Sequence, residues 1–371
     1  MQSRLLQNLD AAIQAAPDKG AWARATCRKA TLLARHGELH DAARLIGAVR
    51  TEFGTALATE AAIWVMLGEG VMAFYSGASD QGIGRFQRAH ALAAAMGQTT
   101  ALPTCAAWLA VCHLNARRFT EMASMVKESL LLAPDTDHQA HARASLVLAD
   151  AYHFGGRFDL ARPWYEATRL HATAEGDESM ISALLHNVAA FRVGNLRLAD
   201  VLGIRYAEEA RRASMEATSA AAYDRYVGTS SLAQYIPHVN AQLLVIEARY
   251  QEALDCLSLI DLSGLGRRSH AVHYVDVATC ALHLGQTALL GEAIARAQNA
   301  IEDSLDKDDI VYVSCRLATI HETLGQDAAA AEAMARAKAE IVTFRAMQSA
   351  LIDSLLNLAA PLLDKPENHR N

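Results

Sequence analysis

Small and apolar side chains return along the chain at a nearly fixed interval. Short segments typical of a tight turn begin at eight anchor positions that share this spacing, namely Gly37, Gly77, Arg117, Gly156, Gly194, Ala248, Gly285 and Gly325. The interval between neighbouring anchors is 37 to 40 residues, except for 54 residues between Gly194 and Ala248. A period of this length predicts a stack of repeated units rather than one large hydrophobic core.

Each unit has the pattern of two antiparallel helices joined by a turn. Seven residues before the anchor a small side chain such as Ala30 or Gly70 is present in seven of the eight units. Nine residues after the anchor the side chain is usually larger and apolar, as at Phe86. Small side chains let two helices approach closely, and a bulky neighbour fills the space beyond them. This predicts an all-α fold, and an ordinary helical bundle is the weaker alternative because it requires no fixed period.

The pattern resembles the tetratricopeptide repeat family over about residues 22–340. The shared features are the small residue, the turn with a glycine and an aromatic residue such as Phe158, the small crossing residue, and Pro134 after a second helix. The interval is longer than the family's usual unit and is similar to extended-helix variants in bacterial signalling proteins. The resemblance implies a right-handed superhelical solenoid of about eight antiparallel helix pairs, forming a single domain over residues 1–363.

Two segments depart from the regular repeat. The long interval before Ala248 places an insertion near residues 213–231, which reads as a helical extension and a loop rich in Gly, Ser and Thr. Insertions in a solenoid often carry function, although a longer helix without a role fits equally well. At the other departure, helical periodicity continues to Pro361, so we expect a capping helix over about residues 340–360. The tail at residues 364–371 is expected to be disordered.

Composition and charge limit the choice of partners and compartment. The chain has 34 Lys and Arg against 41 Asp and Glu, a net charge of −7, which leaves little charge for a broad nucleic-acid-binding face. The first residues are too polar for a secretory signal, and the most apolar stretch is interrupted by Glu69, so neither export nor a membrane span is expected. The six cysteines form no C-x-x-C pair. We therefore expect a cytoplasmic protein with buried, reduced thiols.

The resemblance also implies a binding face, because in this family the first helix of each unit lines a concave groove. The groove positions that we assign to a partner are Trp64, Leu67, Val71, Phe74, Tyr75, Val111, Leu114, Asn115, Arg143, Asp150, His153, Leu184, Val188, Phe191, Arg192 and Gln242. The Lys and Asn with which chaperone-tail receptors of the family hold a terminal carboxylate are absent from the matching positions. A largely apolar wall with a polar centre at Arg143, Asp150 and His153 suits an amphipathic helix or an extended apolar peptide. Alternatively, the superhelix is tight and these side chains pack on one another.

Catalytic and metal-binding patterns are weak. The pairs nearest to metal-ligand spacing are His138/His141 and His270/His273 with Asp276, but H-E-x-x-H is absent, and so are the glycine-rich phosphate loops and the G-x-S-x-G element. We therefore expect no metal, no cofactor and no enzymatic activity.

The leading hypothesis is a non-catalytic scaffold or regulatory adaptor that captures a protein or peptide, with no nucleic-acid or membrane partner. Self-association into a homo-oligomer is compatible with this hypothesis. The second hypothesis is a ligand- or peptide-sensing arm of a bacterial signalling or transcription pathway, although the sequence shows no helix-turn-helix or output domain. An enzyme with a site around Arg143, Asp150 and His153 is the third.

Overall fold

The computed structural model describes residues 3–54, 59–204, 207–228, 235–262, 265, 267–301 and 306–363. These residues form helices and turns, and no strand occurs among them. By its contacts the chain divides into two compact units. Unit 1 comprises Met1–Leu184, Asp224–Ser231 and Ala350–Asn371, and unit 2 comprises Leu185–Tyr223 and Leu232–Ser349. The extent of the predicted single domain over residues 1–363, like the hand of its superhelix, stays a prediction.

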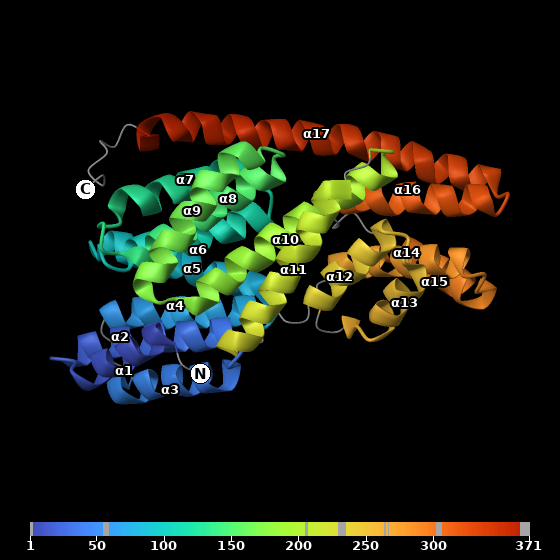
Figure 1. Ribbon diagram of the computed structural model, residues 1–371. Coiled ribbons are helices and arrows are strands. Elements are labelled where there is room, and N and C mark those ends of the chain that lie inside the picture. Colours follow the sequence, from blue (N-terminus) through green and yellow to red (C-terminus); the bar gives the residue numbers. More distant parts are fainter. Residues whose placement is uncertain are drawn as a thin grey trace. The chain divides into compact units, whose positions relative to one another are not determined.

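Unit 1 begins with a short helix and continues with four helix pairs (Figure 1). The helices are α1 (Arg4–Gln14), α2 (Lys19–His36), α3 (Leu39–Phe53), α4 (Thr59–Tyr75), α5 (Ser79–Ala95), α6 (Leu102–Asn115), α7 (Phe119–Leu132), α8 (His138–Phe154) and α9 (Phe158–Glu175). The pairs α2/α3, α4/α5, α6/α7 and α8/α9 pack internally, and α2 also packs on α4 and α6 on α8. We call α2, α4, α6 and α8 the first helices of their pairs.

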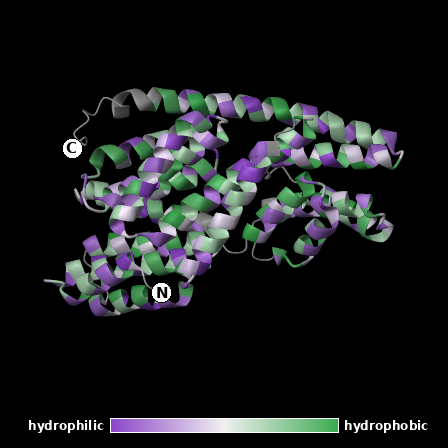
Figure 2. Cartoon of the chain, in the orientation of Figure 1, coloured by the Kyte–Doolittle hydropathy of each residue, from purple (hydrophilic) through white to green (hydrophobic). Residues whose placement is uncertain are grey.

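Unit 2 contains two complete helix pairs and shares three helices with unit 1. Its own helices are α12 (Tyr235–Ile246), α13 (Tyr250–Ser258), α14 (Arg267–His283), α15 (Thr287–Ala300) and α16 (Lys307–Thr323). The shared helices, each with residues in both units, are α10 (Glu178–Val201), α11 (Ala207–Val227) and α17 (Asp327–Leu363). Along the helices apolar and polar residues are interspersed, as expected for helices that pack by one face (Figure 2).

The packing inside one repeat explains the small residues that recur at fixed positions. A Cβ atom added at Gly70 of α4 would lie 2.6 Å from the ring of Phe86 in α5, and one added at Gly82 would lie 3.0 Å from the carbonyl oxygen of Gly70. The two helices can therefore cross at this distance only without side chains at these points. Phe86 in turn is fully buried, as the position after the turn predicts.

Most of the predicted turns are present. Seven anchors have a positive φ, namely Gly37, Gly77, Arg117, Gly156, Ala248, Gly285 and Gly325. Glycine adopts this left-handed conformation without a Cβ clash, and it commonly ends a helix in this way. At Arg117 and Ala248, both with φ of 59°, a residue with a Cβ takes the same conformation.

The turn predicted at Gly194 is wrong. Helix α10 continues through this residue to Val201, and the turn follows at Gly203 with φ of 74°. Leu196, Arg197 and Leu198 are buried just beyond Gly194, so their packing outweighs the cost of about 1 kcal/mol for glycine inside a helix. The extra length of the irregular repeat therefore lies in both α10 and α11 rather than in one insertion.

The predicted insertion and the predicted capping helix both correspond to parts of long, continuous helices. The described part of residues 213–231 belongs mainly to the continuous helix α11, whereas residues 229–231 lie outside the described residues. The expected cap over about residues 340–360 is the second half of the 37-residue helix α17, which starts at Asp327 without a break. The tail at residues 364–371 lies outside the described residues. No helix in the described ranges combines the length and apolarity that crossing a membrane requires.

Candidate functional site

Side chains from the first helices of unit 1 and from the start of α10 form a group that we call the arginine cluster. Its members are Arg35 on α2, Tyr75 on α4, Trp108 on α6, Arg143 on α8, and Asp177, which directly precedes α10. Arg35 donates from Nη1 to Asp177 Oδ2 at 2.7 Å and from Nη2 to Oδ1 at 2.9 Å. Each side chain of this pair is 2% exposed. The cluster thus contains a buried, bidentate ion pair between segments 142 residues apart.

Asp177 is held as a carboxylate by its surroundings. Burial alone raises the pKa of Asp177, but the charge and hydrogen bonds of Arg35 and a hydrogen bond from the Met180 backbone N–H outweigh it and hold that pKa below its usual value. The Met180 N–H donates to Oδ1 at 2.9 Å. Asp177 therefore satisfies the first turn of α10 and neutralises Arg35 at the same time.

Arg143 is the unbalanced charge of the arginine cluster. Its guanidinium carbon lies 3.8 Å from the centroid of the Trp108 ring, and the residue is 6% exposed. Burial, followed by the positive charge of Arg35, lowers the pKa of Arg143 to about 10, although Tyr75 and the negative charge of Asp177 oppose this. Within the described part of the chain Arg143 forms no ion pair. Two guanidinium groups therefore share a single carboxylate, and the cluster carries an excess positive charge.

An aromatic wall supports this guanidinium. The Phe86 ring is stacked on Trp108 with centroids 5.4 Å apart, and the Phe74 and Tyr75 rings meet Trp108 edge-on at 5.7 and 6.4 Å. Trp108 and Phe86 are buried, whereas Phe74 and Tyr75 are half-buried. The cluster thus has a buried floor and a partly accessible rim.

The predicted groove residues fall into three groups. Trp64, Leu67 and Val71 belong to the apolar core of unit 1, and Leu114 and Leu184 are buried as well. Phe74, Tyr75, Val111 and Asn115 retain exposed surface in unit 1. Val188, Phe191, Arg192 and Gln242 lie in unit 2, where Arg192 pairs with Glu216 at 2.7 Å and Gln242 lies 3.2 Å from His238 Nδ1. Trp64, Leu67, Val71, Leu114 and Leu184 are thus buried, and the assignment of the whole set to a partner-binding groove stays a prediction.

The polar centre predicted at Arg143, Asp150 and His153 is divided between two environments. Tyr165 of α9 donates its hydroxyl to Asp150 Oδ1 at 3.0 Å, and His153 Nδ1 lies 3.1 Å from the same hydroxyl oxygen. Asp150 and His153 thus pack within the α8/α9 pair, whereas Arg143 lies on Trp108 of α6. The reason is that Tyr165 offers the two side chains a buried hydrogen-bonding partner.

Further polar contacts join the start of unit 1 to the turn before α10. Arg28 pairs with Glu175 at 2.8 Å, Ser3 donates to Glu178 at 2.6 Å, and the Leu5 N–H donates to the Gly176 carbonyl at 3.2 Å. With Arg35 and Asp177, these contacts connect the start of unit 1 to the turn before α10.

Unit 2 has a buried polar group of its own, which we call the aspartate cluster. Arg197 pairs with Asp309 at 2.7 Å, Arg316 pairs with Asp200 at 2.7 Å, and Tyr312 donates to Asp276 Oδ1 at 2.6 Å. Asp276 Oδ2 has no hydrogen-bond partner among the described residues. Burial raises the pKa of Asp276 to about 6, although the hydrogen bond from Tyr312 and the charge of Arg316 act in the opposite direction.

Of the histidines singled out by their spacing, His138 and His141 both contact His171, whereas His270 contacts a backbone carbonyl. His138 Nδ1 lies 3.0 Å from His171 Nδ1, and the His141 ring is stacked on His171 with centroids 4.8 Å apart. His270 Nε2 lies 2.9 Å from the Leu262 carbonyl oxygen, whereas Asp276 accepts from Tyr312. Across the described ranges no three His, Cys, Asp or Glu side chains are arranged to hold a metal ion.

Comparison with known proteins places the fold. No protein-family model matches the sequence, and no curated protein matches it significantly. The backbone is similar to the crystal structure of a Rap protein complexed with Competence and Sporulation Factor, with a TM-score of 0.50 and 13% identity over 92% of each chain. The chain is an all-α helical-repeat protein.

A second solved structure covers almost the same length. It is a circular tandem repeat protein with novel repeat topology, at a TM-score of 0.22 and 14% identity over 95% of this chain and 96% of that chain. At this TM-score the likeness carries no argument, and at 13% identity the likeness to the Rap protein shows the fold alone. Any function of this helical-repeat protein must therefore be argued from its own residues.

The groove positions assigned from the sequence omit three members of the arginine cluster, namely Arg35, Trp108 and Asp177. Arg35 stands two residues before Gly37, the same position that Tyr75 takes before Gly77. Extending the groove map to the first unit would have found it. Trp108 is off the mapped positions, and Asp177 precedes a helix that the sequence pattern did not delimit, so neither had a comparable signal.

Proposed function

We propose that this protein is a non-catalytic scaffold of the tetratricopeptide type that binds a peptide through unit 1, and that the arginine cluster holds a carboxylate of that peptide. The observation that carries the proposal is the buried guanidinium of Arg143, which lies on Trp108 beside Arg35 without a carboxylate of its own. A buried charge without a counter-ion is costly, and such a cost persists where function uses the charge.

The chemistry of the cluster suits a singly charged, planar anion. Arginine presents parallel N–H donors that match the two oxygens of a carboxylate. The cluster contains two guanidinium groups and the single carboxylate of Asp177, so one additional negative charge balances it. A carboxyl terminus or an acidic side chain supplies this charge.

The rim of the cluster suits an apolar residue next to that carboxylate. Phe74 and Tyr75, whose rings contact Trp108, are half-buried, so the rim offers apolar ring surface and the hydroxyl of Tyr75. Aromatic side chains contribute large contact areas in peptide recognition. The proposed partner is therefore an extended apolar segment or an amphipathic helix that carries a carboxylate.

Several residues support a binding role over a catalytic one. Asp150 and His153 share the hydroxyl of Tyr165 inside a helix pair, so the predicted catalytic alternative has no open acid–base pair there. Burial raises the pKa of Cys27, Cys105, Cys112 and Cys280 to about 12, which keeps these thiols from acting as nucleophiles. All six cysteines are free, which supports the proposed cytoplasmic location.

The likeness to a Rap protein supports the same proposal. That protein forms a complex with Competence and Sporulation Factor on a similar backbone, over 92% of both chains. A regulatory role in a bacterial pathway is the corresponding extension of the proposal to this chain. It rests on analogy of fold, whereas the carboxylate contact rests on the arginine cluster.

The experiment is a screen of random peptides in two matched libraries, one with a free carboxyl terminus and one with an amidated terminus. We expect binders whose affinity falls by more than about tenfold in Arg143→Gln, since hydrogen bonds between charged groups are lost. Arg162→Gln is the matched control, because Arg162 is 73% exposed on α9 and should leave binding unchanged.

The outcome also identifies the source of the carboxylate. Binders found only in the free-carboxyl library would indicate the terminus, and amidated binders rich in Asp or Glu would indicate a side chain. A screen that yields no peptide, or only peptides that bind Arg143→Gln as tightly as the wild type, would contradict the proposal.

A further inference from the structure

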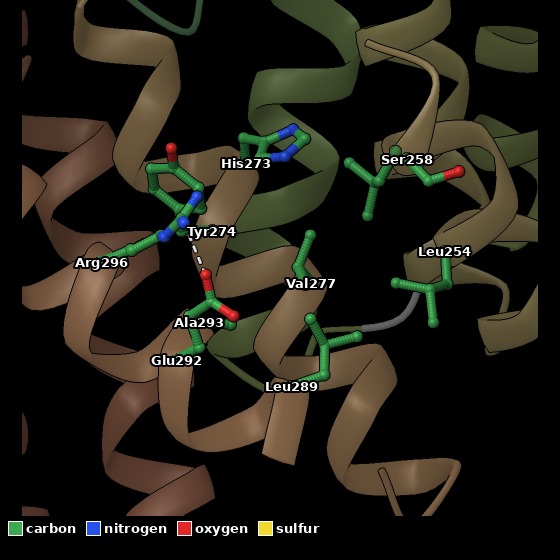
Figure 3. Close-up of a pocket in the computed structure, with 10 residues that line it drawn as sticks. Leu254, Ser258, His273, Tyr274, Val277, Leu289, Glu292, Ala293 and Arg296 are labelled. Atoms are coloured by element: carbon green, nitrogen blue, oxygen red, sulfur yellow. Dashed lines mark ion pairs between the residues drawn. The ribbon is translucent and has the colours of Figure 1, made fainter. Parts of the chain in front are cut away.

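Unit 2 contains a pocket that the proposed peptide site does not use. It has a volume of about 380 Å³ and is formed by α13, α14 and α15. Apolar side chains make up most of its wall, among them Leu254, Val277, Leu289 and Ala293. In Figure 3, Val277 and Leu289 lie near the middle of the view, with Leu254 to one side and Tyr274 and Arg296 to the other. A pocket of this size lies in the range that small molecules occupy.

One wall residue has an unused hydrogen-bonding atom. His273 of α14 lines the pocket and is 7% exposed, and its Nδ1 has no hydrogen-bond partner among the described residues. A buried polar atom without a partner costs about 1 to 3 kcal/mol. A ligand that displaces the atoms covering Nδ1 would remove this cost, and it would gain a polar contact beside the apolar wall.

The charges around the pocket favour a neutral ligand. Burial, with a smaller contribution from His270, lowers the pKa of His273 to about 4, so its ring is neutral near pH 7. The charged side chains at the wall, Glu292 and Arg296, pair with each other at 2.5 Å and are each more than half exposed. Since these charges balance one another, the pocket presents no excess charge to an anion or a cation.

The unpaired Nδ1 of His273 also limits which polar group of a ligand can bond to it. The proton of a neutral imidazole resides on either nitrogen, so Nδ1 donates in one tautomer and accepts in the other. A hydroxyl both donates and accepts, and it can therefore satisfy Nδ1 in either tautomer. A carboxylate only accepts, and it would bring a charge into an apolar pocket.

We propose that the pocket between α13, α14 and α15 binds a small, neutral, mainly apolar molecule whose hydroxyl group bonds to His273. The site is separate from the arginine cluster, because all of its residues belong to unit 2. It gives the chain a second ligand class in addition to the peptide. This places the sensing of a small molecule in the same protein as partner capture.

The test uses the full chain and three probes of similar size: benzyl alcohol, toluene and benzoate. Ligand-observed NMR and the shift in melting temperature measure binding, because all four tryptophans lie in unit 1 and do not report on this pocket. We expect saturable binding of benzyl alcohol and weaker binding of toluene. Benzoate should bind least, because its carboxylate would lose water without a cation to pair with.

Three variants locate the binding. Ala293→Phe fills the pocket and should abolish binding of benzyl alcohol, whereas Ala295→Phe on the exposed face of the same helix is the matched control and should not. His273→Phe should weaken benzyl alcohol by roughly tenfold and change toluene by less than about twofold, since only the hydroxyl contact is lost. If Ala293→Phe does not fold, the smaller Ala293→Leu takes its place.

Three results would overturn this inference. The first is no saturable binding of benzyl alcohol up to its solubility limit, which would leave the pocket to ordered water. The second is equal affinity of wild type and a folded pocket-filling variant. The third is a loss on His273→Phe of the same size for toluene as for benzyl alcohol, which would show that Nδ1 makes no contact.

Discussion

Units 1 and 2 each bury a cluster of charged side chains, and the two clusters carry excess charges of opposite sign. Each contains a buried Arg–Asp pair between segments far apart in the sequence, Arg35 with Asp177 in unit 1 and Arg197 with Asp309 in unit 2. Around the first pair a second guanidinium, Arg143, has no carboxylate, whereas around the second pair Asp276 keeps an oxygen without a partner. The arginine cluster of unit 1 thus has an excess positive charge, and the aspartate cluster of unit 2 has an excess negative charge.

The difference shows why the two clusters have different roles in this account. In unit 2 the surplus is reduced internally, because Tyr312 donates to Asp276 and burial raises the pKa of Asp276 to about 6, close to neutralisation by a proton. In unit 1 the pKa of Arg143 is lowered only to about 10, so the guanidinium stays charged near pH 7. A proton can therefore neutralise Asp276 at mildly acidic pH, whereas Arg143 requires an anion.

The largest effect should come from breaking a buried pair. Arg197→Met leaves Asp309 as an unpaired buried carboxylate and should lower the free energy of unfolding by about 3 to 5 kcal/mol. Arg35→Met should cost less, because the charge of Arg143 still acts on Asp177. Urea denaturation followed by tryptophan fluorescence reports unit 1 through its four tryptophans, and circular dichroism reports the helices of both units.

The control removes both partners of the pair at once. Arg197→Met combined with Asp309→Leu removes both charges of this pair and should recover most of the loss. A loss below about 1 kcal/mol for Arg197→Met alone would show that the pair is not desolvated in solution.

The free energy of unfolding should respond differently to the loss of Arg143 and to the loss of Arg316. The lowered pKa of Arg143 corresponds to a cost of roughly 3 kcal/mol for its charge, partly offset by about 2 kcal/mol from stacking on Trp108. Arg143→Met should therefore unfold at the same free energy as the wild type, within about 1 kcal/mol, or higher. Arg316→Met should be destabilised, because it leaves Asp200 without its ion pair. Equal destabilisation of both variants would make Arg143 a structural residue.

The pH dependence of unit 2 provides a third comparison. Because the folded-state pKa of Asp276, about 6, lies above its ordinary value of 3.8, the folded state binds a proton that the unfolded state lacks between these values. Asp276 therefore stabilises the fold as pH falls from 7 to 5, by about 1 kcal/mol, and Asp276→Asn should lack this gain. His273 acts in the opposite direction, since its pKa is lowered to about 4 and the unfolded state takes up the proton first.

Urea denaturation at pH 7 and pH 5 checks this dependence. Relative to the wild type, Asp276→Asn should lose stability between the two pH values, whereas His273→Phe should gain it. Parallel shifts in both variants would mean that other groups dominate the titration of unit 2.

The smallest expected effect concerns the turns. Ala248 has a φ of 59° at the anchor of its repeat, so Ala248→Gly should raise the free energy of unfolding by about 0.5 to 1 kcal/mol. Arg117 has the same φ but lies over the Phe154 ring at 4.2 Å, so Arg117→Gly should gain less. Thermal unfolding resolves the order of the two variants, and a larger gain at Arg117 would contradict it.

The regular part of the fold could be predicted because it depends on local rules. Glycine at the turn, a small residue before it and a bulky one after it fix the crossing of two helices, as Gly70 and Phe86 show. The turn at Gly194 failed because the buried side chains of Leu196 and Leu198 extend α10, and burial there depends on helices distant in the sequence. Local spacing does not encode such contacts.

The candidate site could be predicted only in part, for the same reason. Arg143 and Tyr75 follow from the repeat register, but the state of charge of Arg143 depends on Asp177 having paired with Arg35 across 142 residues. The register likewise placed Asp150 and His153 on the groove, although Tyr165 binds both inside the α8/α9 pair. The pocket of unit 2 had no sequence signal, because it arises where three helices leave space between them.

The proposal that Arg143 binds a carboxylate of the partner is tested most directly with two small probes and tryptophan fluorescence. N-acetylphenylalanine carries a free carboxylate next to an apolar ring, and N-acetylphenylalaninamide differs only in lacking that charge. In the wild type the acid should change the fluorescence saturably and bind more than about tenfold more tightly than the amide, and in Arg143→Met the two should bind alike. Equal binding of acid and amide to the wild type, or an unchanged preference for the acid in Arg143→Met, would contradict the account.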